Sequence, residues 1–507
     1  MIISFSSSDL IIDSLSFLEL VPSDLECQTK SNDHYGNPIW EDCSKHEICS
    51  GSPHDKYVRN SNGEAVYRKP EHDYYSLNNW VESMDIECKD RFEIGIIGAA
   101  GFLGMTIGSV LGTFLSVRFG RKYIYIGGLF TTTATMFVLT FDAGYNSVII
   151  ALFFYGIGVF SRMTIGYVYA LELVPQHGTM TLGMLLFSGE WVVIIFSNLY
   201  LVCGGRDALI FVYVWLAFSL VPFLFSLFLP ESPMYLHSVG DYEGAKKNVE
   251  KIAWYNLQND VHFDNTYLQK EYSTITPNQK VKGKWCGLIE LYNDKETFVN
   301  TIAMAYLWSF YTFGHHSLLF MMKYFPGNKY VNGLFIAFAI TIAPLITRVL
   351  QNFLSSKQIY YVFSILSILA SLLHEIAFDK ESIGALIMVL FVAVWVDSIG
   401  YTNYYVEYEY FNPRIATLAY GICSTVGRGS SIFAPIVVEE FQEHQILIFL
   451  FLSIIWLFST VFIQKPHDGE VRYVDSDKFV ERNSNEPSGR QSKNSQNKHD
   501  FTFIKKS

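Results

Sequence analysis

Residues Ser116-Val-Arg-Phe-Gly-Arg-Lys-Tyr123 form a short basic turn between two long apolar runs. Arg118, Arg121 and Lys122 resist crossing a lipid bilayer, and such residues collect on the cytoplasmic side of membrane proteins. Gly120 permits a sharp turn between two helices. The turn therefore orients the chain, and every other loop can be assigned to the inner or outer side by counting spans from it.

The composition is typical of a membrane protein. Of 507 residues, 50% are hydrophobic and 16% are aromatic. The apolar residues fall in blocks of about twenty, the length at which a helix crosses the hydrocarbon core. The formal net charge is −11, whereas nucleic-acid binding requires a concentrated basic face. We expect contact with a lipid bilayer and no nucleic-acid partner.

The apolar blocks divide into two sets, separated by a long polar segment. The first set, within residues 92–229, predicts membrane helices at about 92–115, 123–141, 148–171, 181–203 and 207–229. The second set, within residues 298–463, predicts helices at about 298–320, 331–354, 359–376, 383–406, 415–438 and 447–463. Glycines at spacings of three or four along 92–115 favour close helix packing.

Residues 1–20 are the weakest predicted span. Asp9, Asp13 and Glu19 are each costly near the centre of a bilayer. The segment has neither the basic start nor the cleavage site of a signal peptide. We expect a partial first helix, the outer end of a span whose beginning is missing or unusual.

Three polar segments complete the chain. Counting from the basic turn places 21–91 outside the cell and 230–297 in the cytoplasm, which agrees with the lysines of the second segment. Within that segment, 240–258 has the spacing of a short amphipathic helix at the inner membrane surface. Residues 464–507 are expected to form a disordered cytoplasmic tail.

Four of the seven cysteines cluster in the outer segment, at Cys27, Cys43, Cys49 and Cys88. They predict two disulfides and leave three pairings open. A zinc site is the alternative, but zinc sites commonly use a CxxC pair, which this chain lacks. We therefore expect no metal site.

Four stretches resemble motifs of the major facilitator superfamily and, within it, of the organic cation, anion and carnitine transporter group. They are Arg118-Phe-Gly-Arg-Lys122, Glu172 with Pro175, Pro230-Glu-Ser-Pro233, and Glu409 through Pro435. The second and fourth also form a faint internal repeat, because an acid and a proline end a helix in both halves. Their order and spacing are more specific than any one of them.

The resemblance implies an all-α membrane protein with twelve transmembrane helices in two pseudo-symmetric six-helix bundles. It implies that solute crosses by alternating access at a midplane cavity. It also implies gating roles for Arg118, Gly120, Arg121, Lys122, Glu172, Glu231 and Glu409.

The chain departs from the family pattern at several motif positions. Val117 stands in place of an acid that ties the turn to a neighbouring helix end, and Thr113 stands in place of a glycine. Met234-Tyr235 replaces an arginine-tryptophan pair, and Asn412 and Ala416 replace a proline and an arginine. The second-half turn near Ser355 lacks its glycine and arginine pair. A non-transporting receptor or scaffold derived from the same fold therefore stays open as an alternative.

Four ionisable residues lie inside predicted spans: Arg162, Glu190, Asp397 and Arg428. Such residues usually pair with one another or face a cavity. We hypothesise that Glu190 and Arg428, at similar depths in repeat-matched helices, face one central cavity. The resemblance implies that arginine at 428 accompanies anionic or carnitine substrates, and its fork of donors suits a carboxylate or sulfate. The alternative is a structural salt bridge from Arg428 to Asp397 or Glu190.

Aromatic residues accompany these charges at helical spacing. Asp397, Tyr401, Tyr405 and Tyr408 share much of one face, and Trp308, Tyr311 and His315 do the same in another span. Rings can hold flat organic ions or cations, or simply pack helices together. His315 and His316 could couple proton movement, or merely form hydrogen bonds at a helix end.

The sequence thus predicts a transporter of small organic ions, with anionic or zwitterionic substrates slightly favoured. Organic cation or sugar transport within the same superfamily is the alternative. Neither GxxxxGK[ST] nor GxSxG nor HExxH occurs, so we expect no enzyme activity and no cofactor. We expect a multi-pass monomer in the plasma membrane.

Overall fold

The computed structural model describes most of the chain up to residue 464. The described residues are 4–5, 10–20, 25–32, 35–49, 57–59, 65–68, 78–84, 86, 88–141, 144–174, 179–257, 295–325, 327–377, 382–411, 413–441 and 444–464. The expectations for 258–294 and for the tail beyond 464 lie outside them.

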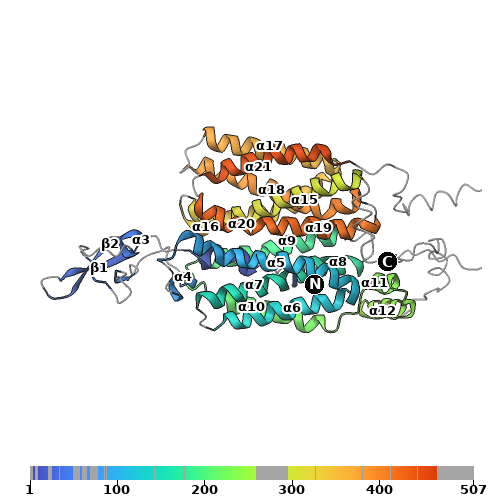
Figure 1. Ribbon diagram of the computed structural model, residues 1–507, viewed down its shortest axis with the longest axis horizontal. Coiled ribbons are helices and arrows are strands. Elements are labelled where there is room, and N and C mark those ends of the chain that lie inside the picture. The colour runs from blue at the N-terminus through green and yellow to red at the C-terminus, as the bar shows by residue number, and fades with distance from the viewer. Residues whose placement is uncertain are drawn as a thin grey trace, which may run out of the picture. The chain divides into compact units, whose positions relative to one another are not determined.

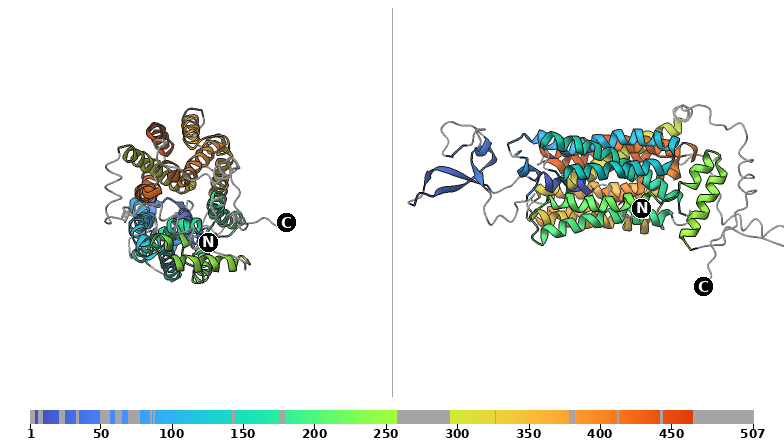
Figure 2. Two further views of the ribbon diagram at one scale, coloured as in Figure 1. Left: turned by 90° about the vertical axis from the view of Figure 1, so that its right-hand side faces the viewer. Right: turned by 90° about the horizontal axis from the view of Figure 1, so that it is seen from below.

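The N-terminal half contains long helices that run side by side (Figures 1 and 2). Their bounds are α2 Leu10–Leu18, α5 Arg91–Phe119, α6 Arg121–Leu139, α7 Tyr145–Phe160, α8 Gly166–Glu172, α9 Thr179–Val202 and α10 Ile210–Ser226. A π-helical turn, η1 (Ser161–Ile165), joins α7 to α8. Two shorter helices follow this half, α11 Pro233–Ser238 and α12 Tyr242–Tyr255.

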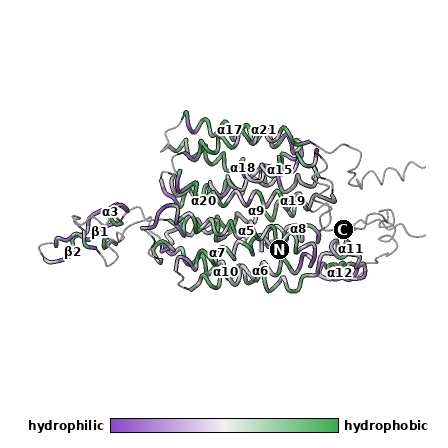
Figure 3. The backbone as a smooth tube through the Cα atoms, viewed as in Figure 1, coloured by the Kyte–Doolittle hydropathy of each residue, from purple (hydrophilic) through white to green (hydrophobic). Residues whose placement is uncertain are grey.

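The C-terminal half repeats this arrangement. Its helices are α15 Lys295–Met321, η4 Met322–Tyr324, α16 Lys329–Leu350, α17 Ser356–Ala377, α18 Ile383–Tyr410, α19 Pro413–Ser431, α20 Phe433–Glu440 and α21 Gln445–Phe462. In the described part, eight helices are long and apolar enough to cross a membrane, and α10 is a shorter apolar helix. Hydrophobic residues continue along the helices of both halves (Figure 3). The predicted all-α membrane fold is confirmed.

One predicted span contains a short interruption. The span predicted at 415–438 corresponds to one apolar span, Ala419–Glu440, in which a turn at Ile432 separates α19, which ends at Ser431, from α20, which begins at Phe433. Pro435 explains the break, because it has no N–H to donate and its ring clashes with the carbonyl of the residue four positions earlier.

The glycine-rich face of α5 packs against α7 at backbone distance. A Cβ on Gly104 would lie 2.0 Å from the carbonyl oxygen of Phe153, and one on Gly156 would lie 2.0 Å from that of Gly101. Small residues permit such close contact between membrane helices, where dispersion replaces the hydrophobic effect as the attraction. The close helix packing predicted from the small-residue pattern is therefore confirmed, and the partner of α5 is α7.

The two halves meet along α5 and the α19–α20 pair. A Cβ on Gly98 would lie 3.2 Å from both Phe320 and Pro435. Further along α5, the hydroxyls of Ser109 and Thr425 are 2.6 Å apart. We call this contact, from Gly98 to Thr113 of α5 and from Gly421 to Pro435 opposite, the α5–α19 seam. A second contact between the halves joins α9 and α16.

The polar segment after α2 contains a three-stranded sheet in the order β2-β1-β3. The strands are β1 Leu25–Asn32, β2 Pro38–Cys43 and β3 Tyr67–Arg68, and α3 (Lys45–Cys49) follows β2. Disulfides join Cys27 to Cys43 and Cys49 to Cys88. These bonds confirm the two predicted disulfides and select one of the three pairings. Metal-binding groups of His, Cys, Asp or Glu are not found among the described residues.

Candidate functional site

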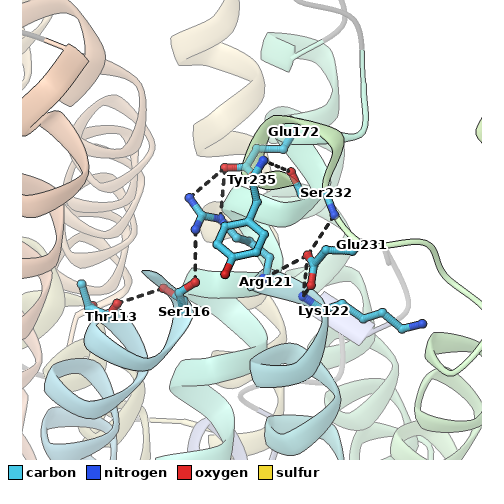
Figure 4. A network of polar contacts seen from close by, with 8 residues as sticks. All are labelled: Thr113, Ser116, Arg121, Lys122, Glu172, Glu231, Ser232 and Tyr235. Carbon is cyan, nitrogen blue, oxygen red and sulfur yellow. Dashed lines mark hydrogen bonds and ion pairs between the residues drawn. The ribbon is translucent and has the colours of Figure 1, made fainter. Parts of the chain in front are cut away.

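The basic turn is held by a carboxylate from a distant part of the chain. Helix α6 begins at Arg121, directly after Gly120. Glu231 Oε1 accepts hydrogen bonds of 3.1 Å from the backbone N–H groups of both Arg121 and Lys122. A carboxylate is favoured there because the unpaired N–H groups of a helix N-terminus carry partial positive charge. Glu231 therefore acts as the N-terminal cap of α6 (Figure 4).

Gly120 is required by this geometry on two grounds. Its φ angle is +94°, a conformation that L side chains rarely adopt. A Cβ at this position would also lie 2.3 Å from Glu231 Oε2. Glu231 can approach the backbone this closely only because residue 120 has no side chain. The capping contact therefore depends on both Gly120 and Glu231.

The guanidinium of Arg121 joins the turn to the end of α8. Its Nη2 lies 3.2 Å from Glu172 Oε1, and its Nη1 donates to the Ser116 carbonyl at 3.2 Å. The ring of Tyr235 lies 5.1 Å from the guanidinium, and its hydroxyl donates to the Arg118 carbonyl. Tyr235 is one of the departures from the family pattern, and here it supplies a cation–π contact.

The structure thus brings together most of the predicted gating residues. Arg121, Lys122, Glu172 and Glu231 form one network of polar contacts (Figure 4), and Gly120 adjoins Glu231. Burial lowers the pKa of Lys122; the nearby Lys251 adds to this effect and Glu231 opposes it. Arg118 contributes its carbonyl, while its guanidinium lies over Phe119. The side chain of Glu409 lies outside the described part of the chain.

Thr113 fits the seam because its neighbour across the two halves is a glycine. A Cβ on Gly421 would lie 3.0 Å from Thr113 Cγ2. The family pattern places glycine at position 113, and here the larger residue packs where Gly421 leaves room. The departure at Thr113 is therefore accommodated locally.

Arg428 is buried on α19 and faces the opposite half of the protein. Its guanidinium lies 5.2 Å from the ring centre of Phe160, at the end of α7. Its Nη2 is 3.9 Å from the sulfur of Met163, in η1. Only 5% of Arg428 is exposed. Two contacts of this buried guanidinium across the halves are a thioether and an aromatic face, and its fork of donors is chemically suited to an anion.

Arg162 occupies the π-helical turn next to Met163 and is fully buried. It donates to Thr132 Oγ1 at 3.1 Å and to the Ser4 carbonyl at 2.6 Å. π-helical turns are rare and often occur at functional sites. Met163, which contacts Arg428, directly follows Arg162 in the chain.

Asp397 does not pair with Arg428. Its Oδ1 lies 2.8 Å from Nδ1 of His315 on α15, and both side chains are 3% exposed. This contact excludes the salt bridge between Arg428 and Asp397 that the sequence left open. Asp397 therefore pairs with His315, and the alternative pairing of Arg428 with Glu190 stays untested because the side chain of Glu190 lies outside the described residues.

Aromatic rings from both halves meet at Tyr404. Its ring lies 4.5 Å from Phe187, 5.5 Å from Tyr167 and 4.6 Å from Trp308. Tyr401 joins this group through Phe187, and Tyr311 joins it through Trp308. We call this the aromatic cluster. The side chains of Tyr405 and Tyr408 lie outside the described part.

Sequence reasoning missed Tyr404. It follows Asp397 by seven residues, a spacing that returns to the same helix face as Tyr401. That spacing could have identified Tyr404 from the sequence, but the prediction named Tyr405 and Tyr408 instead.

A separate cavity of about 520 Å³ lies between α15, α19–α20 and α21. Its lining includes Tyr306, Phe313, Ser430 and Phe441. None of the predicted substrate-binding residues lines it. The candidate site is therefore the interface around Arg428 and the aromatic cluster rather than this cavity.

Comparisons with known proteins agree with the fold and the motifs. The family model described as Major Facilitator Superfamily matches residues 83–435. Solute carrier family 22 member 16 of Bos taurus is 24% identical over 407 residues, covering 76% of this chain and 65% of that protein. Organic cation/carnitine transporter 2 of Mus musculus is 24% identical over 372 residues, covering 71% of this chain and 64% of that protein. The chain thus spans somewhat less than two thirds of the length of these relatives.

Solved structures show the same fold. The proton:xylose symporter XylE bound to 6-bromo-6-deoxy-D-glucose aligns with a TM-score of 0.61 and 14% identity, covering 91% of this chain and 92% of XylE. An inward open conformation of XylE from E. coli aligns with a TM-score of 0.57 and 16% identity over 77% of this chain and 92% of XylE. The chain belongs to the Major Facilitator Superfamily, and its relatives confirm the resemblance to the organic cation, anion and carnitine transporter group.

Proposed function

We propose that this protein is a plasma-membrane transporter that moves small organic anions or zwitterions by alternating access. The observation that carries the proposal is the position of Arg428. It is buried, it belongs to the C-terminal half, and it contacts Phe160 and Met163 of the N-terminal half. A residue in that position can bind solute, and its contacts with the other half change when the two halves move apart.

The anion preference follows from the chemistry around Arg428. A carboxylate or sulfate would replace its thioether and ring contacts with two charge-assisted hydrogen bonds, which are stronger. Asp397, one of the two acids that could pair with Arg428, is bound to His315. Arg162, which precedes Met163 in the chain, adds a second buried cation. Glu190 stays a proposed substrate contact on the strength of its sequence position.

Alternating access is supported by the contacts that would have to open. On one side the halves meet along the α5–α19 seam, where the Ser109 and Thr425 hydroxyls touch. Near the middle, Tyr167 and Phe187 of one half contact Tyr404 of the other. Rocking of the halves would part these rings and expose Arg428, with Trp308, Tyr311 and Tyr401 as further substrate contacts.

Organic cation transport is the second candidate, favoured by the aromatic cluster. Ring faces attract cations, and five of the rings are on helices of the two halves that face one another: Tyr167, Phe187, Trp308, Tyr401 and Tyr404. The names of the relatives include cations and carnitine. Substrate charge therefore has to be decided by uptake.

The test is uptake by the full chain in proteoliposomes, with p-toluenesulfonate as anion, carnitine as zwitterion and tetraethylammonium as cation. We expect accumulation of the first two, and R428A should reduce it roughly tenfold or more, the effect of losing about 1.4 kcal/mol. R428K keeps the charge without the planar fork and should recover part of the uptake. R348A, at a half-exposed arginine of α16, is the matched control and should transport normally.

The outcomes separate the candidates. Uptake of tetraethylammonium alone would establish the cation alternative. Binding of a probe without accumulation would favour a receptor. Unchanged uptake by R428A would remove Arg428 from the site.

A further inference from the structure

We propose that Asn78 and Asn79 latch a gate between the two halves, by holding in place the two side chains that contact Tyr330 from the opposite half. The inference rests on the proposed alternating-access function, which it deepens by naming residues that close one end of the transport path. The gate is the contact of Phe17 and Arg206 with Tyr330. We call it the Tyr330 gate.

Tyr330, at the start of α16, is contacted from two separate elements of the N-terminal half. The ring of Phe17, in the last turn of α2, lies 6.0 Å from its ring, centre to centre. The guanidinium of Arg206, between α9 and α10, lies 5.4 Å from the same ring centre. Both are attractive contacts of an aromatic ring, and Tyr330 is fully buried. They have to be lost when the halves separate here.

The packing one turn further along α16 makes the closed gate reversible. A Cβ on Gly333 would lie 2.2 Å from Asn198 Oδ1 of α9 and 3.1 Å from Phe17 Cζ. Asn198 is buried, and its Oδ1 has no hydrogen-bond partner among the described residues. A buried oxygen without a donor is costly, and water would satisfy it once the gate opened. Other contacts must therefore hold the gate closed.

Asn79 fixes the position of Phe17. Its side-chain nitrogen donates to the carbonyl of Phe17 at 3.0 Å and to that of Leu20 at 2.9 Å. Its side-chain oxygen accepts from the N–H of Val81 at 3.1 Å. The last carbonyls of a helix have no partner within the helix, so the two donors of one amide group close the end of α2. Asn79 is 1% exposed, and these bonds are therefore shielded from water.

Asn78 fixes the segment that carries Arg206. Its backbone N–H donates to the carbonyl of Arg206 at 2.8 Å, and its carbonyl accepts from the N–H of Ala208 at 2.9 Å. The backbone rather than the side chain makes this connection. Because Asn78 and Asn79 are adjacent, one dipeptide holds both elements that contact Tyr330.

The Tyr330 gate and the basic turn lie at opposite ends of α5. Phe320, at the end of α15, would lie 3.2 Å from a Cβ on Gly98, near the start of α5, whereas the basic turn follows the last residue of that helix. Met322 follows Phe320 closely, and its sulfur would lie 2.9 Å from a Cβ on Gly333. Alternating access needs separate closures at the two ends of the path, and the Tyr330 gate is suited to be one of them.

The first experiment measures how often the gate opens. Met322 is 2% exposed and packs beside the gate, so M322C should react with a water-soluble methanethiosulfonate only while the gate is open. The full chain is held in lipid nanodiscs, and the three cysteines outside the disulfides are replaced by C203S, C286S and C423S.

We expect N79A to raise the labelling rate of M322C roughly fivefold or more, because lost hydrogen bonds shift the equilibrium toward the open gate. N78A is the matched control, since the backbone of this exposed residue makes the connection, and it should label at the parent rate. R206A removes the second contact without touching α2; it should also raise the rate, and it provides the measurement if N79A does not fold. Parent rates for the variants of Asn79 and Arg206 would overturn the inference.

A double-variant cycle separates a latch from a merely structural role. Y330L removes the ring that both side chains contact, and it should itself raise the labelling rate. If Asn79 acts through Tyr330, N79A should add less than roughly twofold in the Y330L background, although it lowers the unfolding temperature similarly in both backgrounds. An undiminished effect of N79A on labelling in the Y330L background would overturn the inference.

The labelling needs no substrate, so the latch and the transport proposal can fail separately. Labelling that depends on Asn79, in a chain that accumulates none of the three uptake probes, would remove the transport proposal and leave the latch standing. Uptake by a chain whose labelling does not depend on Asn79 would do the reverse.

Discussion

Glu231 caps the N-terminus of α6 from 110 positions away, with its Oε1 3.1 Å from the backbone nitrogen of Arg121. Helix caps usually come from the residue just before the helix, but here that residue is Gly120, which has no side chain to offer. The basic turn and the Pro230-Glu-Ser-Pro233 motif therefore form one structural unit.

Replacing Glu231 by alanine should destabilise the end of the N-terminal half at which α6 begins. We expect the loss of the cap to cost about 1 to 2 kcal/mol, seen as a lower unfolding temperature of the purified protein in detergent. E231Q keeps an oxygen acceptor and should lose less. Equal stability of E231A and the parent would show that the N–H groups of Arg121 and Lys122 find other acceptors.

Substituting alanine for Gly120 should be harmful although the change adds one methyl group. The positive φ and the 2.3 Å approach to Glu231 Oε2 should together cost roughly 1 to 3 kcal/mol. G127A is the matched control, because a Cβ on Gly127 of the following helix meets nothing within 4 Å. It should be neutral or slightly stabilising. Similar unfolding temperatures for the two variants would contradict the steric argument.

The disulfide pattern of the segment that contains β1, β2 and α3 can be tested directly. Non-reducing digestion and mass spectrometry should give linked peptides for Cys27 with Cys43 and for Cys49 with Cys88. Reduction should separate both pairs. Replacing Cys27 and Cys43 together by serine should destabilise the small sheet by about 2 to 4 kcal/mol, detected as faster proteolysis of that segment. Peptides linking Cys27 to Cys49 would disprove the observed pairing.

We expect the α5–α19 seam to open during transport. Cysteines introduced at Ser109 and Thr425, whose hydroxyls are 2.6 Å apart, should form a disulfide under mild oxidation and reduce uptake roughly tenfold or more, because a cross-linked seam removes one conformation from the cycle. A reductant should restore uptake. S109C alone and T425C alone should be insensitive to oxidant. Full uptake by the cross-linked protein would place the moving contact elsewhere.

The sequence by itself determined the membrane class, most spans and the two disulfides. Each depends on local properties, since an apolar block of about twenty residues has to be a helix in lipid whatever lies next to it. The glycine spacing of α5 likewise predicted close packing, because helical periodicity alone brings those residues to one face. The span predicted at 415–438 is present, and its interruption between α19 and α20 has a cause that is also local, the proline at position 435.

Only the tertiary structure decided the partners of the charged and aromatic residues. Asp397 could have met Arg428, Arg162 or a histidine, and helix rotation and depth selected His315, which is 82 positions away. The same holds for Glu231 with the start of α6 and for Tyr404 with Phe187. Periodicity assigns a side chain to a face of its own helix, but which helix lies opposite, and at what height, is set by the packing of all the helices together.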